Sequence, residues 1–296
     1  MSKRTLAIIG ATFVAMIYGS TFTIAKDVMP TYVQPFGFIL IRSIGATILF
    51  WLLTFFAPKE KIDKKDFPRI MAAAFFGVAF NQLTFFKGLS YTSPISASVI
   101  MVTAPIIVLI LSAILIKERI EIKKVIGIII GLTGTSILIL YGKSIGNSSN
   151  ANWGNFLVFT NAFSYAIYLI IVKKLISKYH AFTFIKWIYS FGLLFVIPFG
   201  YSEFNAIEWQ SIPIDIYYKI GFVVFFTTFL AYLINLMAMK QLKPTTLSVF
   251  IYLQPLFAAS FAISLGKDEL NLIKITSAVL IFIGVYLVTQ KKATSN

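Results

Sequence analysis

The chain has 296 residues, of which 58% are hydrophobic and 12% are charged, and its net charge is +15. Soluble domains carry about 25% charged residues, so this composition argues against a soluble protein. The 26 Lys and Arg residues lie mostly between hydrophobic runs and do not gather on one polar face, which argues against nucleic-acid binding. The absence of Cys excludes disulfides, thiolate metal sites and cysteine nucleophiles.

Ten apolar segments of near-membrane length follow one another along the chain, and a spanning helix needs about 20 such residues. The first five are expected near residues 5–25, 36–56, 69–89, 94–116 and 122–141. The second five are expected near residues 153–172, 182–200, 216–239, 244–265 and 272–290. The first segment resembles a signal peptide, but no clear small-x-small cleavage site follows it, and we interpret it as an uncleaved span.

The basic residues predict the orientation, because cytoplasmic loops carry an excess of Lys and Arg. Most of them fall in segments that lie inside when the N-terminus is cytoplasmic, such as 59–69, 117–124 and 173–178. The segment 201–217 holds three acidic residues and no basic residue, which is typical of an external loop. The sequence therefore predicts a multi-pass protein of the cell (inner) membrane with both termini in the cytoplasm.

The chain also repeats itself. Shifting it by 150 residues aligns the following pairs: Pro94 with Pro244, Ser98 with Ser248, Pro105 with Pro255, and Gly134 with Gly284. A shift of 147 residues aligns Tyr18 with Tyr165 and Lys26 with Lys173. We therefore expect two repeats of five helices, residues 1–146 and 147–296, and since five is odd the second must be inverted in the membrane. Inverted repeats are typical of transporters.

The two halves carry a series of short motifs: Tyr18-Gly19-Ser20-Thr21-Phe22, Lys26, Pro35, Arg42, the run from Gly88 to Pro94, Ala104-Pro105, Lys117-Glu118-Arg119, Gly127, Lys243-Pro244, Gln254-Pro255 and Lys267-Asp268-Glu269. Together these motifs resemble the EamA-type branch of the drug/metabolite transporter superfamily. The resemblance covers essentially the whole chain. It implies ten transmembrane helices in an all-α integral membrane protein, a central cavity, and export or uptake of small metabolites. One departure is Tyr18, where the family motif usually begins with Trp.

Polar side chains at mid-membrane depth are costly and are therefore candidates for a substrate cavity. Asn161, Tyr165 and Tyr168 share one stripe of their helix, and we expect Ser248, Tyr252 and Pro255 to share another. The full set of cavity candidates is Tyr18, Asn81, Gln82, Ser98, Asn161, Tyr165, Tyr168, Tyr232, Asn235, Ser248, Tyr252 and Gln254. The alternative for each is a hydrogen bond between helices without a role in transport.

Pro105 and Pro255 are expected well inside their spans, where each would remove an amide donor from the helix. Such a break is either a hinge or a static kink, and the equivalent placement of the two prolines favours paired hinges. Arg42 could attract an anionic group of the substrate, but its long side chain could also extend to the outer interface, and we favour the second interpretation. No acidic residue is expected at mid-membrane, which favours facilitated diffusion or exchange over coupling to protons.

These features predict a transporter of small metabolites, with amino acids or similar polar solutes as the first choice, working by alternating access through a central cavity. No catalytic residue, metal or cofactor is expected: the single histidine, His180, is interpreted as an interfacial loop residue. The expected partners are a small-molecule substrate and membrane lipids, without nucleic acid, in a monomer or homodimer. The alternatives are a transporter of drugs or sugar phosphates, a lipid-handling protein, and an intramembrane enzyme.

Overall fold

The computed structural model describes residues 1–56, 58, 60–92, 97, 100–140, 150–264 and 272–290, and all regular structure in these ranges is helical. Six helices are long and apolar enough to cross a membrane: Lys3–Val28, Pro35–Phe56, Lys64–Tyr91, Asn152–Lys178, Ala181–Asn205 and Ile214–Met239. They match six of the ten expected segments. Shorter helices occupy the other four: α6 (Ala104–Leu115), α7 (Ile122–Leu140), α12 (Pro244–Ser248) with α13 (Leu253–Ser264), and α14 (Leu272–Thr289).

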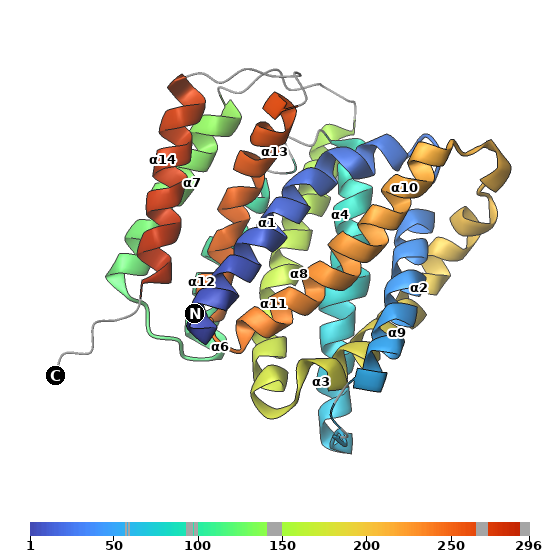
Figure 1. Cartoon of the computed structure of the whole chain (residues 1–296), viewed down its shortest axis with the longest axis horizontal. Coiled ribbons are helices and arrows are strands. Elements are labelled where there is room, and N and C mark those ends of the chain that lie inside the picture. The colour runs from blue at the N-terminus through green and yellow to red at the C-terminus, as the bar shows by residue number, and fades with distance from the viewer. Residues whose placement is uncertain are drawn as a thin grey trace.

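The two halves pack in the same pattern (Figure 1). The first helix of the first half, α1 (Lys3–Val28), contacts α11 (Ala231–Met239) and α13 of the second half. The first helix of the second half, α8 (Ala151–Lys178), contacts the equivalent helices of the first half, α4 (Phe80–Tyr91) and α6. Two further pairs join a helix to its own counterpart in the other half, α2 (Pro35–Leu53) with α9 (Ala181–Asn205) and α7 with α14. Each half therefore packs largely against the other, as expected of two related units that share one interface.

The first and last helices meet at one end of the molecule. The Arg4 guanidinium at the start of α1 donates a hydrogen bond to the Thr289 carbonyl at the end of α14, over 2.6 Å, and Figure 1 shows α1 beginning and α14 ending toward the lower left. The helical chain therefore starts and finishes on the same side, which agrees with an even number of crossings.

The third and eighth spans contain π-turns at nearly equivalent positions. One is η3 (Phe75–Ala79), between α3 (Phe67–Ala74) and α4, and the other is η5 (Val223–Leu230), between α10 (Ile214–Phe222) and α11. In each, an amide bonds five residues back: Phe80 to the Phe75 carbonyl, and Ala231 to the Phe226 carbonyl. π-Helical segments inside α-helices occur frequently at functional sites.

The fourth and ninth spans are interrupted just before their prolines. Val102 and Thr103 form a turn ahead of α6, and a 3₁₀ segment, η6 (Val249–Tyr252), precedes α13. Pro105 therefore stands in the first turn of α6 and not deep inside a helix, a position where the missing N–H costs little. The expected breaks exist, but the α-helix stops before the proline and restarts one residue before Pro105 and two residues before Pro255.

The seventh span is longer than its apolar core. The polar residues from Tyr201 onward were expected to form a loop, but α9 continues to Asn205. The reason lies in packing, because the Glu203 carboxylate accepts hydrogen bonds from the backbone N–H of Phe36 and Gly37 over 2.6 and 2.9 Å. A carboxylate at the start of α2 satisfies amides that the helix leaves free and complements its dipole.

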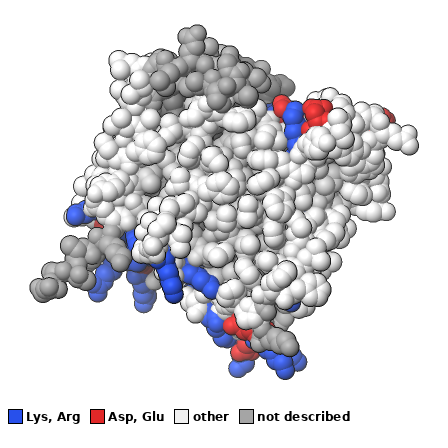
Figure 2. Space-filling view, viewed as in Figure 1, with Lys and Arg blue, Asp and Glu red and all other residues white. Residues whose placement is uncertain are grey.

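Large apolar side chains cover the outside of the bundle. Ile114, Leu194 and Tyr286 are more than 60% exposed, and Figure 2 shows a broad band without charged side chains between two charged edges. Inside, α7 and α14 approach closely: a Cβ on Gly284 would lie 2.6 Å from both the Gly127 carbonyl oxygen and the Gly131 amide nitrogen. An apolar band over tightly packed helices is the surface of a protein that spans a bilayer.

Candidate functional site

A cavity of about 110 Å³ lies between the two halves. Its walls come from α1, α2, the α3–η3–α4 span, the fourth span, α8, the α10–η5–α11 span and the ninth span. A water molecule needs about 10–15 Å³ on this measure of volume, so the cavity has room for a solute of roughly ten non-hydrogen atoms. That is the size of a small metabolite.

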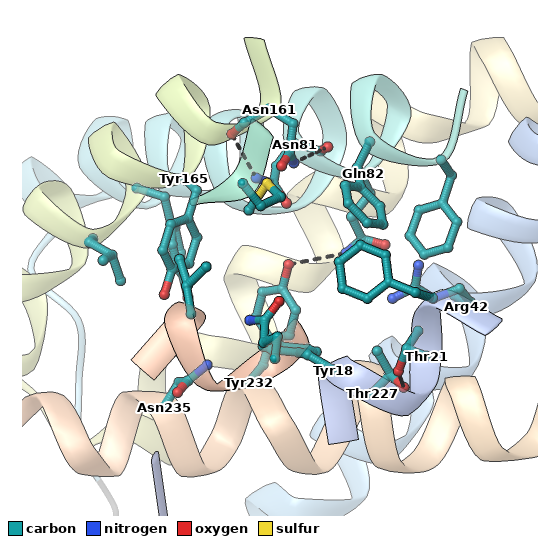
Figure 3. A pocket seen from close by; sticks show the side chains of 18 of the residues that line it. Tyr18, Thr21, Arg42, Asn81, Gln82, Asn161, Tyr165, Thr227, Tyr232 and Asn235 are labelled. Atoms are coloured by element: carbon teal, nitrogen blue, oxygen red, sulfur yellow. Dashed lines mark hydrogen bonds between the residues drawn. The ribbon is translucent and has the colours of Figure 1, made fainter. Parts of the chain in front are cut away.

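Nine of the candidate residues line this cavity: Tyr18, Asn81, Gln82, Asn161, Tyr165, Tyr168, Tyr232, Asn235 and Gln254. Figure 3 shows Tyr165 and Asn235 at one end, and Arg42 with Thr21 and Thr227 at the other. Ser248 and Tyr252 lie outside the lining, and Ser98 lies outside the described residues.

The stripe expected from Ser248 to Pro255 does not form, because η6 is a 3₁₀ turn. With about three residues per turn instead of 3.6, positions four apart no longer share a face. Tyr252 instead packs fully buried against α7, where a Cβ on Gly131 would lie 2.5 Å from the tyrosine ring. The Ser248 hydroxyl donates to the Thr245 carbonyl over 3.1 Å. Ile251 and Gln254 line the cavity from this segment.

Two asparagines hold the halves together at the cavity wall. The Asn161 amide donates to the Asn81 carbonyl over 2.7 Å, and the Asn81 amide donates to the Asn161 carbonyl over 3.3 Å. Both donors therefore satisfy the backbone of the opposite helix. Asn81 and Asn161 thus form a hydrogen bond between helices, the alternative given above to a role in transport. Both residues also line the cavity.

The Tyr232 side chain, from α11, contacts the π-turn η3 of the opposite half. Its hydroxyl donates to the Gly77 carbonyl in η3 over 2.8 Å and lies 3.4 Å from the Gln82 amide nitrogen. The Tyr168 ring occupies the space beside Gly77, where a Cβ would lie 2.1 Å from it. Only glycine fits here, so η3 packs directly against Tyr168 and Tyr232, and both tyrosines line the cavity.

Three polar or charged lining residues were absent from the candidate set: Thr21, Thr227 and Arg42. The Thr21 hydroxyl donates to the Ile17 carbonyl and lies 2.7 Å from the Thr227 hydroxyl, which ties α1 to η5. A signal for Thr21 existed in the sequence, because it follows Tyr18 by three residues and so lies on the same helix face. No local pattern marks Thr227.

Arg42 does not reach the outer interface, as its long side chain had led us to expect. It is 2% exposed and lines the cavity. Its Nε donates to the Thr228 hydroxyl over 2.9 Å, and its guanidinium carbon lies 4.2 Å from the centre of the Phe86 ring. These two contacts, one from each half, keep the charged group at the cavity wall.

Charged side chains gather at the ends of the bundle. Asp66 pairs with Lys178 and Arg69 near the start of α3, and Glu118 pairs with Lys124. On the other side Lys219 pairs with Asp27 over 2.8 Å. Among the described residues no group of His, Cys, Asp and Glu is suited to hold a metal ion.

His180 is the N-cap of α9, where its Nδ1 accepts from the Phe182 amide over 3.4 Å. Partial burial and the nearby Lys240 lower the pKa of this imidazole. The shift favours the neutral form, which is the form that can accept at Nδ1. His180 thus has a local structural role at the end of the bundle.

Known proteins named as transporters resemble this chain over nearly its full length. A protein of Archaeoglobus fulgidus named as an uncharacterized transporter is 29% identical over 99% of this chain and 100% of its own length. The transporter YyaM of Bacillus subtilis, also named as uncharacterized, is 25% identical over 90% of this chain and 88% of its own. A WAT1-related protein of Arabidopsis thaliana is 24% identical over 96% of this chain and 82% of its own.

The fold also has a counterpart among solved structures. One crystal structure matches 97% of this chain and 96% of its own with a TM-score of 0.72 at 16% identity, which shows a shared fold. The sequence model of the EamA-like transporter family matches twice, over residues 5–140 and 152–290, once in each half. The chain therefore belongs to the EamA-like transporter family, as its motifs predicted, and is a multi-pass membrane transporter.

Proposed function

We propose that this transporter carries small polar metabolites, amino acids or similar solutes, through the central cavity, by export or exchange. The observation that supports this most is the placement of the cavity. It lies between two equivalent halves, and its lining combines the hydroxyl and amide groups of Tyr18, Tyr165, Asn235 and Gln254 with aromatic walls. No hydrogen-bond partner for these four side chains occurs in the described parts of the chain, so they are free to bind a solute.

Alternating access is the mechanism that the internal symmetry favours. Both π-turns and both breaks before Pro105 and Pro255 occur at nearly equivalent places in the two halves. Helix irregularities of this kind are where a bundle bends. If the halves exchange conformations, bending at the breaks in one half mirrors bending at those in the other. Pro105 and Pro255 would then mark paired flexing points.

The proposed topology has ten spans, with α6, α7, the α12–α13 segment and α14 crossing in addition to the six long helices. Figure 2 shows Lys and Arg gathered along the edge where α1 begins and α14 ends. Because cytoplasmic surfaces carry the excess of basic residues, this edge is proposed to face the cytoplasm of a cell with the protein in its inner membrane.

The test of function is flux in proteoliposomes. A panel of radiolabelled protein amino acids, glycerol and glucose 6-phosphate is offered to liposomes with and without the protein, and a fluorescent phosphatidylcholine reports lipid scrambling. We expect saturable, protein-dependent uptake of at least one polar solute, faster when the liposomes are preloaded with the same unlabelled solute. Lipid scrambling without uptake of any solute would contradict the proposal and favour a lipid-handling protein.

The topology has its own test, because a Cys-free chain allows single cysteines to be placed at will. Ser202 and Ser177 are both exposed, near the end of α9 and the end of α8 respectively. We expect Ser202→Cys to react with an impermeant maleimide only from outside intact cells, and the matched Ser177→Cys only after the membrane is opened. The reverse pattern would invert the topology.

The tyrosines of the cavity offer a second test, since two of them differ in hydrogen bonding. Tyr232→Phe removes the bond to the Gly77 carbonyl and should lower the free energy of unfolding by about 0.6 kcal/mol. For Tyr165 the described residues offer no hydrogen-bond partner, so Tyr165→Phe should leave stability unchanged. Tyr165→Phe should slow flux roughly two- to tenfold, the effect of one lost hydrogen bond to the solute, and Tyr232→Phe should slow it less, because the Tyr232 hydroxyl proton is already donated to Gly77. Unchanged flux in both variants would remove these hydroxyls from the transport path.

A further inference from the structure

The only charged side chain in the described cavity lining is Arg42. Its ion-pairing partner would have to be an acidic residue, but the acidic residues that form ion pairs in the described chain, Asp27, Asp63, Asp66, Glu118 and Asp215, all pair with Lys or with Arg69. Glu203 bonds to the amides at the start of α2. Arg42 is thus a buried cation without a fixed counter-charge in the described structure. Such a charge is costly unless an anion comes to it.

The guanidinium is held so that one of its nitrogens is left without a hydrogen-bond partner in the described chain. The Thr228 hydroxyl donates to the Val223 carbonyl over 2.8 Å in the π-turn and accepts from Arg42 Nε over 2.9 Å. One face of the group lies on Phe86. The Nη1 atom is buried and has no hydrogen-bond partner in the described chain. Arginine stays protonated at every physiological pH, so this nitrogen is a permanent charged donor.

Gln82 supplies a hydrogen-bond acceptor without a partner, as Arg42 Nη1 is a donor without one. Gln82 is 2% exposed and lines the same cavity, and its Oε1 also has no hydrogen-bond partner in the described chain. Figure 3 shows the Gln82 amide on the Arg42 side of the cavity, with Tyr165 and Asn235 at the opposite end. The site is therefore asymmetric: a cation and an acceptor stand at one end, and uncharged polar groups stand at the other.

We propose that Arg42 and Gln82 form a carboxylate-recognition site, so that the transported solutes are small carboxylic acids with an N–H or O–H donor beside the carboxylate, such as α-amino acids and 2-hydroxy acids. The carboxylate accepts from Arg42, and the neighbouring donor bonds to Gln82 Oε1. This inference rests on the proposed function and narrows its substrate class. A phosphate monoester fits less well, because it carries close to two charges and the described lining offers one cation.

The experiment compares acids with their primary amides in proteoliposomes and by thermal stabilisation of the detergent-solubilised protein. The acids are the radiolabelled protein amino acids and lactate, and each is matched with its amide as competitor. Glycerol and glucose 6-phosphate serve as a neutral and a phosphate solute. We expect at least one acid to be transported, and its amide to compete at least tenfold more weakly. An amide that competes as well as its acid overturns the proposal.

Variants assign the effect to the site. Arg42→Gln should raise the half-saturation concentration for the acid roughly 10- to 100-fold, the loss of one charged hydrogen bond, and Arg42→Lys should fall between it and the native protein. The control is Lys186→Gln, since this basic residue stacks on Trp51 away from the cavity lining, and it should transport normally. If Arg42→Gln does not fold, Gln82→Leu tests the acceptor: it should weaken an amino acid more than the corresponding acid without the N–H donor.

The outcomes separate this proposal from the transport function. Uptake of glycerol or glucose 6-phosphate with no uptake of any carboxylic acid overturns the carboxylate site and leaves transport standing. Normal acid transport by a folded Arg42→Gln variant also overturns it. No protein-dependent uptake of any solute in the panel contradicts the proposed function itself, and the carboxylate site falls with it.

Discussion

Gly19→Val is expected to abolish flux and to destabilise the protein. A Cβ at this position of α1 would lie 2.7 Å from the Gln254 carbonyl oxygen, 3.1 Å from Phe257 Cβ and 3.3 Å from the Ala258 amide nitrogen. Two of these neighbours are backbone atoms, which cannot turn away as a side chain can. Overpacking of this kind costs about 1–3 kcal/mol. Relief requires α1 to move off α13, and that shift would deform the cavity wall at Tyr18 and Gln254.

The matched control is Gly221→Ala, because a Cβ on Gly221 meets no atom within 4 Å. Alanine in an open helical position should leave stability unchanged or raise it by up to about 1 kcal/mol. Thermal unfolding in detergent and flux in proteoliposomes are measured for both variants. A Gly19→Val protein with native melting temperature and native flux would show that α1 and α13 do not need this close approach.

A cysteine inside the cavity is expected to make transport sensitive to a thiol reagent. Asn235 is a suitable site, since it lines the cavity and its side chain has no hydrogen-bond partner in the described structure. Asn235→Cys should keep roughly a tenth to a half of the native flux, because it loses one hydrogen bond to the solute. Reaction with sulfonatoethyl methanethiosulfonate adds a bulky anion to a cavity that holds roughly ten non-hydrogen atoms, so flux should fall at least tenfold and recover with dithiothreitol. Ser202→Cys, exposed at the end of α9, should react without loss of flux.

The sequence was informative where hydropathy and periodicity decide the structure. The two repeats, the six long helices and the family follow from apolar length and from motifs such as Tyr18-Gly19-Ser20. Part of the cavity lining was also predictable, because a polar side chain in a long apolar helix usually faces the interior of the bundle. Tyr165 and Asn235 were found in this way, and both line the cavity.

Local irregularities and the orientation of Arg42 were not predictable, because contacts distant in sequence determine them. The turn before α6 and the 3₁₀ segment before α13 change which residues face the cavity, and this removed Tyr252 from its expected place. Arg42 is directed inward by Thr228, which lies 186 residues further along the chain. Its apolar stem is compatible with either direction, so the sequence of its own helix leaves the question open.

The most direct test of the account is the two-sided accessibility of Asn235→Cys during transport. Alternating access through the cavity predicts that an impermeant thiol reagent reaches this cysteine from the outside and, in separate inside-out vesicles, from the inside. It also predicts that a transported amino acid slows the reaction from both sides. Complete modification from either side with flux unchanged would contradict it, because the solute would then be crossing the membrane by a path that does not include the cavity.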